Sequence, residues 1–341
     1  GYLIERQLLI FILPLVIPIS ISIKPQQVTS LLFTLSGSCV IAVVYLFSNM
    51  LLNVYENYGT INFDILFSGA FFNHYFTTPI GIHAGYLSMY CVISICSLTY
   101  ELITVSCWKS NVIRLKMLLL LGLGIFFLAS RNSTISLLCI LLFVMPFFIS
   151  KSLRVLYISA SAIFALAVGL SIYFTPFLQE RFSNQLISDI KPLSNGSEIN
   201  YNIIEPRIER WVCAWDLIVK SPVYGYGTGD EVAVLQNAYN TKGMVISSLN
   251  ALNAHNTYLS ITLKHGLIGL MLFLGLIITY TYWSIQARYF MYLSLLIVFW
   301  IGFYTENILD TNKGILCFAV FNTLMAYALI DTTQGPIHGL K

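Results

Sequence analysis

The sequence predicts an all-α fold, a single polytopic bundle of transmembrane helices over residues 1–341. Three observations predict this class. Hydrophobic residues fill 57% of the positions and charged residues only 10%, with a mean hydropathy of +0.78, unlike a soluble domain. Several apolar runs reach the roughly 20 residues that a helix needs to cross a hydrocarbon core of about 30 Å. The charged residues are concentrated in one segment outside those runs.

Nine membrane helices are expected, because a chain in lipid must satisfy its backbone hydrogen bonds within each apolar run. Their ranges are 7–23, 28–52, 79–104, 113–130, 133–150, 153–174, 257–284, 288–304 and 313–330. The chain begins with Gly1 instead of Met, and its first apolar run follows almost at once. We therefore expect further helices upstream of this sequence.

Positive charges in the short loops orient the bundle, because Lys and Arg in such loops are retained on the cytoplasmic side. The charges are Lys109, Arg114 and Lys116 in one loop, Lys151 and Arg154 in a second, and Arg288 in a third. With these loops inside, the outer side receives 53–78, the turn at Arg131, 175–253 and 305–312. The inside–outside alternation holds for every expected helix.

The net charge of +3 is spread thinly and forms no basic run, so nucleic acid is not an expected partner. Of the seven cysteines, only Cys213 falls in the long outer segment, which excludes a disulfide framework within it. Asp64 has no carboxylate partner two residues away, and no cluster of histidines is visible. The sequence therefore predicts no metal site and no bound cofactor.

Residues 175–253 form the most polar segment and hold 14 of the 33 charged positions. The first half, with "SNQLISDIKPLSNGSEINYN", is rich in Ser and Asn, which is typical of an exposed loop. An amphipathic helix is predicted over 206–220, since a proline stands at its start and another follows its end. Trp211 and Trp215 share or border one face of this helix, which favours a position along the outer membrane surface.

Arg207 and Arg210 are three residues apart in this helix, so they can share a face. Paired guanidinium groups suit phosphate, because each is permanently charged and offers a fork of donors. The alternative is a solvated helix whose arginines pair with nearby carboxylates such as Glu209. The glycines of "GYGTGD", residues 225–230, more simply permit a tight backbone path than bind a nucleotide, because no strand precedes them.

Other polar residues stand at the outer ends of the expected helices. Arg131, in "LASRNSTISL", either faces the bundle as a site residue or extends back to the interface. His83 suits a structural role as well as a substrate contact. His255, in "NAHNTYLSITLKHGLIGL", is a candidate general base, at the entrance of a helix that we expect to be interrupted near Gly266 and Gly269.

Five motifs occur in one order: "IHAGYL", "SRNSTISLL", "RIERWVCAWDLIVKSPVYGYGTGD", "NAHNTYLSITLKHGLIGLMLF" and "TENILDTNKGILCFAVFNTL". Together they resemble the O-antigen ligase and O-antigen polymerase superfamily of bacterial membrane glycosyltransferases, over roughly residues 75 to 330. The resemblance implies a GT-C-like helical fold in the bacterial inner membrane. It also implies that 175–253 is one large periplasmic loop and that the active site faces the periplasm.

The resemblance further implies metal-independent, inverting transfer of a glycan from an undecaprenyl-pyrophosphate donor. Arg131 and Arg210, with Arg207 as a close rival of Arg210, would hold the pyrophosphate, and His255 would take the proton of the acceptor. The residues expected around them as substrate contacts are Arg207, Trp211, Asn256, Tyr258 and His83.

We expect an O-antigen polymerase of surface polysaccharide biosynthesis, which joins one lipid-linked glycan to another. Its partners would be membrane lipid and a chain-length regulator. The alternatives are an O-antigen ligase, whose acceptor is lipid A–core, and a protein O-oligosaccharyltransferase. A polysaccharide transporter is less consistent with the sequence, because it predicts internal repeats and charges in the middle of helices.

Overall fold

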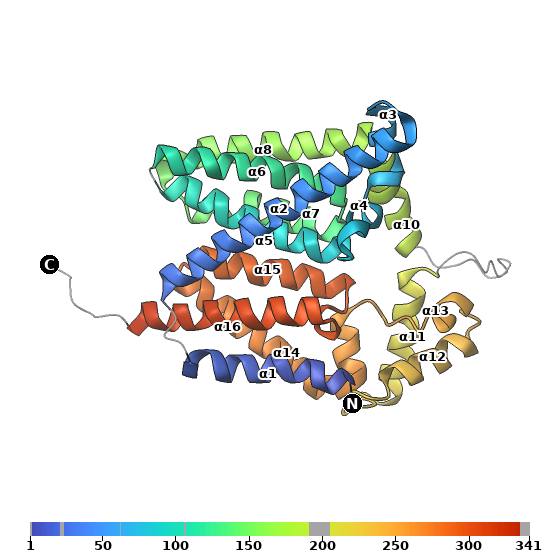
Figure 1. The fold of residues 1–341 in the computed structure, drawn as a ribbon. Helices are drawn as coiled ribbons and strands as arrows, with labels where there is room; N and C mark the ends of the chain where they lie inside the picture. The colour runs from blue at the N-terminus through green and yellow to red at the C-terminus, as the bar shows by residue number, and fades with distance from the viewer. Residues whose placement is uncertain (1, 21–23, 62, 106, 191–204, 335–341) are drawn as a thin grey trace. The chain divides into compact units, whose positions relative to one another are not determined.

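The computed structural model describes residues 2–20, 24–61, 63–105, 107–190 and 205–334. In these ranges the chain is helical and contains no strand, which confirms the all-α class (Figure 1). The longer helices are α1 Tyr2–Ser20, α2 Pro25–Tyr58, α5 Ala84–Thr104, α6 Trp108–Leu128, α7 Arg131–Cys139, α8 Lys151–Phe174, α11 Arg207–Lys220, α12 Glu231–Thr241, α14 Thr257–Gln286, α15 Phe290–Thr305 and α16 Asn312–Gln334. The short ones are α3 Phe63–Leu66, α4 His74–Thr77, α9 Pro176–Gln179, α10 Gln185–Ile190 and α13 Val245–Leu249.

Every predicted membrane range overlaps a helix or helical run, and residues 21–23 of the first range lie outside the described residues. By length and composition, six described helices can cross a membrane, namely α2, α5, α6, α8, α14 and α16. The remaining ranges correspond to shorter apolar stretches at Gln7–Ile19, Arg131–Phe147 and Phe290–Thr305. The chain is therefore a multi-pass membrane protein, and the count of nine spans stays a prediction.

The predicted start of one helix is wrong. The range 113–130 corresponds to α6, which begins at Trp108, so Arg114 lies inside a helix and not in a loop. Arg114 is buried, and its guanidinium lies 2.9 Å from the carboxylate of Glu101. A buried cation needs such a partner, and the last turn of α5 supplies it.

Two other predicted segments also differ from the structure. The range 133–150 is not one α-helix, because α7 is followed by a π-helical segment, Ile140–Val144, and a 3₁₀ turn, Met145–Phe147. Pro146 lies in that turn and cannot donate a backbone hydrogen bond. The predicted exposed loop around residue 190 contains α10, and its continuation over 191–204 lies outside the described residues.

The chain divides into two compact units. Unit 1 consists of 1–20, 183–283 and 299–323, and unit 2 consists of 21–182, 284–298 and 324–341. Helices α14, α15 and α16 contribute residues to both units.

In unit 2, α5 packs against α2 and α6, and these two also contact each other. Gly124 permits the close approach of α6 to α2, since a Cβ there would lie 2.8 Å from a methyl carbon of Val43. A phenylalanine cluster packs around the C-terminal end of α6, with neighbouring ring centroids 4.8 to 6.1 Å apart. Its members are Phe47, Phe67, Phe72, Phe76, Phe126, Phe127 and Phe177.

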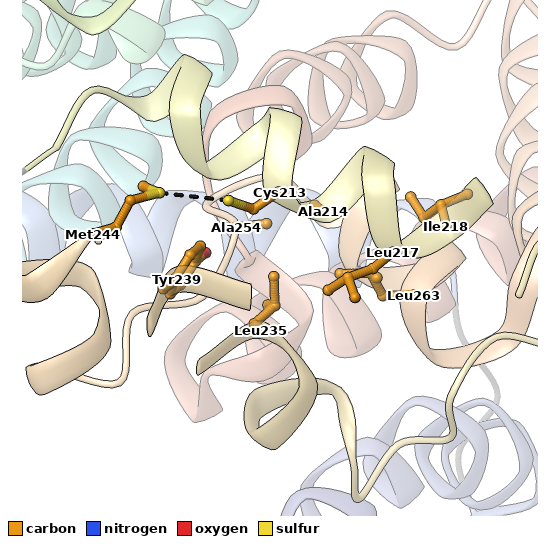
Figure 2. Close-up of a cluster of buried hydrophobic side chains, with 9 residues drawn as sticks. All are labelled: Cys213, Ala214, Leu217, Ile218, Leu235, Tyr239, Met244, Ala254 and Leu263. Atoms are coloured by element: carbon orange, nitrogen blue, oxygen red, sulfur yellow. Dashed lines mark hydrogen bonds between the residues drawn. The ribbon is translucent and has the colours of Figure 1, made fainter. Parts of the chain in front are cut away.

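In unit 1, α11 is amphipathic, as predicted for 206–220. Its buried positions recur one turn apart, and Figure 2 shows them packed against α12, the following loops and the first part of α14. The buried cluster that they form consists of Cys213, Ala214, Leu217, Ile218, Leu235, Tyr239, Met244, Ala254 and Leu263. Trp215 lies on the opposite, exposed face. The position of this face at a membrane surface stays a prediction.

Helix α14 is interrupted at Gly266, whose φ of +63° is left-handed, as the sequence predicts. The loop 222–227 crosses the interruption and satisfies the backbone groups that it frees. Tyr226 N–H and Gly227 N–H donate to the carbonyls of Leu263 and Lys264 at 2.7 and 2.9 Å. Leu267 N–H donates in turn to Pro222 O at 2.7 Å. This crossing is the tight backbone path that the "GYGTGD" glycines predict.

Only two of those three glycines are required there. Gly225 has a φ of +70°, and a Cβ would lie 2.5 Å from Leu263 O. Gly227 has a φ of +92°, whereas Gly229 has no neighbour within 4 Å of a built Cβ. The interruption that we expected near Gly266 and Gly269 thus occurs at Gly266.

Gly266→Ala is expected to destabilise the protein by more than about 2 kcal/mol, because the added methyl meets left-handed strain and the backbone of the crossing loop. A Cβ at this position would lie 2.0 Å from Val223 O. The midpoint of thermal unfolding in detergent measures the effect.

The matched control is Gly275→Ala in the same helix, where no atom lies within 4 Å of the built Cβ. That variant should unfold at the wild-type temperature or up to a few degrees above it. Equal midpoints for the two variants would contradict the strain argument.

Candidate functional site

His255 lies directly before α14 in unit 1 and pairs with a carboxylate. Its φ of +49° is a conformation that non-glycine residues adopt sparsely and that recurs at functional sites. Its N–H donates to Asn253 Oδ1 at 3.0 Å. The ring Nδ1 lies 3.2 Å from Glu306 Oε2, in the loop after α15. The carboxylate therefore fixes the plane and the tautomer of the imidazole.

Arg207, the first residue of α11, reaches the same carboxylate. Its Nη2 lies 3.3 Å from Glu306 Oε1, and its Nη1 donates to Thr305 O at 3.1 Å. Asp189 lies further away, with 3.9 Å between its Oδ2 and Arg207 Nε. Glu306 thus bridges His255 and Arg207 with one oxygen to each.

Arg210 lies one turn further along α11 and is only 4% exposed. Its Nε has no hydrogen-bond partner in the part of the chain that the structure describes. Burial lowers the pKa of Arg210, and the charge of Arg207 adds to that effect, while Tyr239, Asp189 and Glu306 oppose it. A buried guanidinium with an unused donor has the chemistry to bind an anion.

Three predicted substrate contacts near His255 have structural hydrogen bonds. Asn256 is buried, and its Oδ1 accepts from Leu259 N–H at 3.0 Å, so it caps α14. Tyr258 donates its hydroxyl to Trp300 O at 3.1 Å, and Trp211 Nε1 donates to Ala254 O at 2.9 Å. Their direct contact with substrate stays a prediction.

These aromatic residues also line a shallow hollow of about 400 Å³ in unit 1. Trp211 meets Tyr304 edge to face with 5.2 Å between the ring centroids, and Trp215 and Tyr304 are largely exposed. The hollow therefore offers aromatic faces beside the His255 loop.

A buried ion network lies next to the site, and sequence reasoning missed it. Lys264, in the first part of α14, is 2% exposed, and its Nζ lies 3.0 Å from Glu231 Oε2 and 2.6 Å from Asp310 Oδ1. Gln7 and Ser260 also donate to Asp310, at 3.2 and 3.3 Å. Burial raises the pKa of Glu231, and the ammonium group of Lys264 opposes that rise. One ammonium thus joins α12, α14 and the 3₁₀ turn Ile308–Asp310.

This network reaches the backbone of the His255 loop through one amide side chain. Asn307 Nδ2 donates to Asp310 Oδ2 at 3.1 Å, and Asn307 Oδ1 accepts from Asn256 N–H at 2.7 Å. Thr257 Oγ1 donates to Glu306 O at 2.6 Å and accepts from Ile308 N–H at 3.2 Å. The loops of His255 and Glu306 are therefore joined directly after His255, beside the dyad that these two residues form.

Arg131 and His83 belong to unit 2, so their association with Arg210 and His255 stays a prediction. Arg131 is half-buried and begins α7, directly after Ser130. His83 caps α5, because its Nδ1 accepts from Gly85 N–H at 3.1 Å, and its ring also contacts His74 and Tyr86. The structural role of His83 is thus observed.

In the described ranges, no group of three or more His, Cys, Asp or Glu side chains is arranged to hold a metal ion. The charges that gather in unit 1 are Arg207, Arg210, Lys264, Glu231, Glu306 and Asp310. The chemistry available from these residues is anion binding by guanidinium groups and proton transfer by a histidine paired with a carboxylate.

Residues 117–274 match a family model described as O-antigen ligase. This stretch is therefore similar to O-antigen ligases. It extends from α6 into α14 and contains Arg131, Arg207, Arg210 and His255. The match confirms the superfamily that the five motifs predict. Among curated proteins, no sequence matches the chain.

The matched stretch ends before Glu306 and Asp310, the two carboxylates that complete the unit 1 site. Both occur in the motif "TENILD", between two apolar runs. That placement is a usable signal, but only the tertiary contacts show that Glu306 faces His255 and that Asp310 faces Lys264.

Lys264→Met is expected to destabilise the protein by about 3–5 kcal/mol, because it leaves two buried carboxylates without their cation. The free energy of unfolding in detergent measures this loss. Lys242→Met is the matched control, since Lys242 Nζ also lies 2.6 Å from a carboxylate, that of Asp216, but with 37% and 51% of the two side chains exposed. That exposed pair should contribute no more than about 1 kcal/mol. Equal losses would show that burial does not decide the effect.

Glu205 supplies a cap to α13 from 41 residues earlier in the matched stretch. Its two carboxylate oxygens accept from the N–H groups of Ile246 and Ser247 at 2.9 and 2.8 Å, and Ser247 Oγ donates at 2.7 Å. Burial alone would raise the pKa of Glu205, but these hydrogen bonds outweigh it and hold the pKa below its usual value. A depressed folded-state pKa stabilises the protein above the unfolded pKa, and the effect disappears as pH falls through the folded one.

Glu205→Gln is therefore expected to lower stability by about 1 kcal/mol at neutral pH. The difference from wild type should begin to fade as pH falls below the ordinary glutamate pKa of about 4.3, and should be lost once pH has passed the lower folded-state pKa. Thermal unfolding midpoints across this pH range test the prediction. Glu56→Gln, at the exposed end of α2, serves as the control. A difference that persists unchanged at pH 3 would contradict the linkage.

Proposed function

We propose that the protein is an O-antigen polymerase that transfers a glycan from an undecaprenyl-pyrophosphate donor to an acceptor sugar, at the periplasmic face of the bacterial inner membrane. The observation that carries this proposal is Arg210, a buried guanidinium with an unused Nε among the described residues, within electrostatic reach of Glu306. A departing pyrophosphate carries concentrated negative charge, which a buried arginine can stabilise. The O-antigen ligase match supports glycosyl transfer of this general type.

His255 is the proposed general base. Glu306 accepts from Nδ1–H, so the lone pair of Nε2 is left to take the proton of the acceptor hydroxyl. The same carboxylate stabilises the imidazolium that forms. The acceptor oxygen then attacks the anomeric carbon, the bond to the pyrophosphate breaks, and a single displacement inverts the configuration.

The two arginines of α11 have different proposed roles. The two terminal nitrogens of Arg207 already contact Thr305 O and the carboxylate of Glu306, so Arg207 holds the carboxylate that orients His255. Arg210 has a donor left over and is the proposed pyrophosphate ligand. In this proposal Arg210, and not Arg207, is the essential arginine of the loop.

The donor's isoprenoid tail is proposed to lie in an apolar groove of unit 2. This groove, of about 400 Å³, runs between α6, α7 and α8 and is lined chiefly by apolar side chains such as Phe126, Leu137, Phe164 and Val168. Thr134 and Leu137 line it within two turns of Arg131, at the start of α7. Arg131 keeps its proposed role as a second pyrophosphate ligand.

The acceptor separates the polymerase from its alternatives. A ligase would use lipid A–core, and a protein O-oligosaccharyltransferase would use a Ser or Thr side chain. Deletion of the gene distinguishes these functions. Lipopolysaccharide with a single repeat indicates a lost polymerase, whereas bare core with lipid-linked long chains indicates a lost ligase.

Arg210→Lys is expected to lower glycan transfer by at least about 100-fold, because a point charge cannot reproduce the forked contacts of a guanidinium. His255→Ala should cost about 10²–10⁴-fold, the usual contribution of general-base assistance. Arg131→Ala should also abolish most transfer. The assay follows transfer from lipid-linked donor in membranes that lack the wild-type enzyme.

Lys220→Ala is the matched control, because Lys220 is a basic residue at the exposed end of the same helix as Arg210. Its transfer rate should equal that of the wild type. Full activity in well-folded Arg131, Arg210 and His255 variants would refute the assignment.

A further inference from the structure

Unit 2 contains a second cavity, of about 530 Å³, that no step of the proposed reaction uses. It lies between the second half of α2 and the segment that carries α4 and the 3₁₀ turn Thr78–Ile80. Its volume is within the usual range of about 300–1,000 Å³ for sites that bind small ligands. Buried Leu46 and Met50 form part of its wall, so that side is packed into the core.

The lining of this cavity combines apolar side chains with uncharged polar ones. Asn49 and Asn53 are one turn apart on α2, and Asn53 Nδ2 donates to Asn49 Oδ1 at 2.9 Å. That bond uses one donor and one acceptor, so the two amides still offer N–H groups and a carbonyl oxygen. Tyr45 and Tyr75 add two exposed rings with hydroxyl groups, and Thr78 adds a further hydroxyl. None of the described residues that line the cavity carries a charge.

This chemistry excludes two kinds of ligand and favours a third. A pyrophosphate or a phosphate headgroup would find no compensating cation in the lining. A hydrocarbon tail would leave the amides without hydrogen-bond partners. A neutral sugar fits both features, since its hydroxyl groups exchange hydrogen bonds with amides and its C–H faces pack on aromatic rings.

The cavity is separate from the apolar groove in the same unit. Phe76 lines the cavity and Phe127 lines the groove, and their ring centroids are 5.5 Å apart within the phenylalanine cluster. The two lining sets share no residue, and this aromatic contact lies between them. A lipid tail can therefore occupy the groove without entering the cavity.

We propose that this cavity is a subsite for a neutral saccharide segment of the glycan, held by Asn49 and Asn53 and packed on Tyr45 and Tyr75. That this saccharide belongs to the transferred glycan rests on the proposed function. The expected orientation places this end of α2 on the outer side, together with 175–253. A sugar subsite there retains a glycan chain without taking part in the chemistry.

Direct binding tests the subsite without requiring turnover. The probe is the producing strain's own surface polysaccharide, freed of lipid and pyrophosphate by mild acid, and saturation-transfer NMR follows its binding to the full chain in nanodiscs. Measurements in an Arg210→Ala, His255→Ala background remove the contribution of the proposed catalytic residues. In this background we expect Asn53→Leu and Asn49→Leu to weaken binding by about tenfold or more, the equivalent of one lost hydrogen bond.

Asn57→Leu is the matched control, because Asn57 lies one turn beyond Asn53 on the exposed surface of α2 and is not part of the lining. Its binding should equal that of the background protein. Tyr75→Ala, from the opposite wall, should weaken binding as the asparagine variants do. Thermal unfolding of each variant verifies that it is folded.

Binding that is absent in the background protein, or equal in the Asn49, Asn53 and Asn57 variants, overturns the subsite. If the wild type shows no glycan transfer but binding still depends on Asn53, the proposed function fails and the subsite stands. If transfer proceeds while no binding depends on Asn49 or Asn53, the subsite fails alone.

Discussion

A single buried ammonium group holds unit 1 together. Lys264 lies between Glu231 and Asp310 at hydrogen-bond distance, with almost no exposed surface. Separating any of these three groups would leave a charge buried without a partner, which is far more costly than losing an exposed ion pair. The helices and the 3₁₀ turn that carry them therefore keep one arrangement.

The candidate site inherits its geometry from that arrangement. Asp310 holds Asn307, and Asn307 holds the backbone directly after His255. Glu306 stands in the same short loop, so whatever fixes Asn307 also fixes the carboxylate that meets His255 and Arg207. A hydrogen-bonded histidine needs this support, since productive geometry tolerates only small displacements.

The interruption of α14 makes this arrangement possible. In an uninterrupted helix the carbonyls would accept intrahelical hydrogen bonds. The left-handed Gly266 instead leaves the carbonyls of Leu263 and Lys264 free to accept from the crossing loop. Backbone groups in a membrane protein must find such partners inside the protein. The glycines that look like a phosphate loop in the sequence instead join the loop after α11 to α14.

The sequence by itself determined the all-α class, the apolar helices, the amphipathic helix at 206–220, the interruption at Gly266 and the superfamily, because each follows from local composition, period or motif order. It also marked Arg207, Arg210 and His255. Only the tertiary structure decided what these residues touch. The motif that holds Glu306 and Asp310 is visible in the sequence, but the contacts of these two carboxylates and of Lys264 were beyond prediction. Their partners are distant in sequence, and the sequence does not say whether a charge between two apolar runs is solvated or buried. Burial and pairing are properties of the packed chain, and they separate Arg207, which holds a carboxylate, from Arg210, which has a donor left for a ligand.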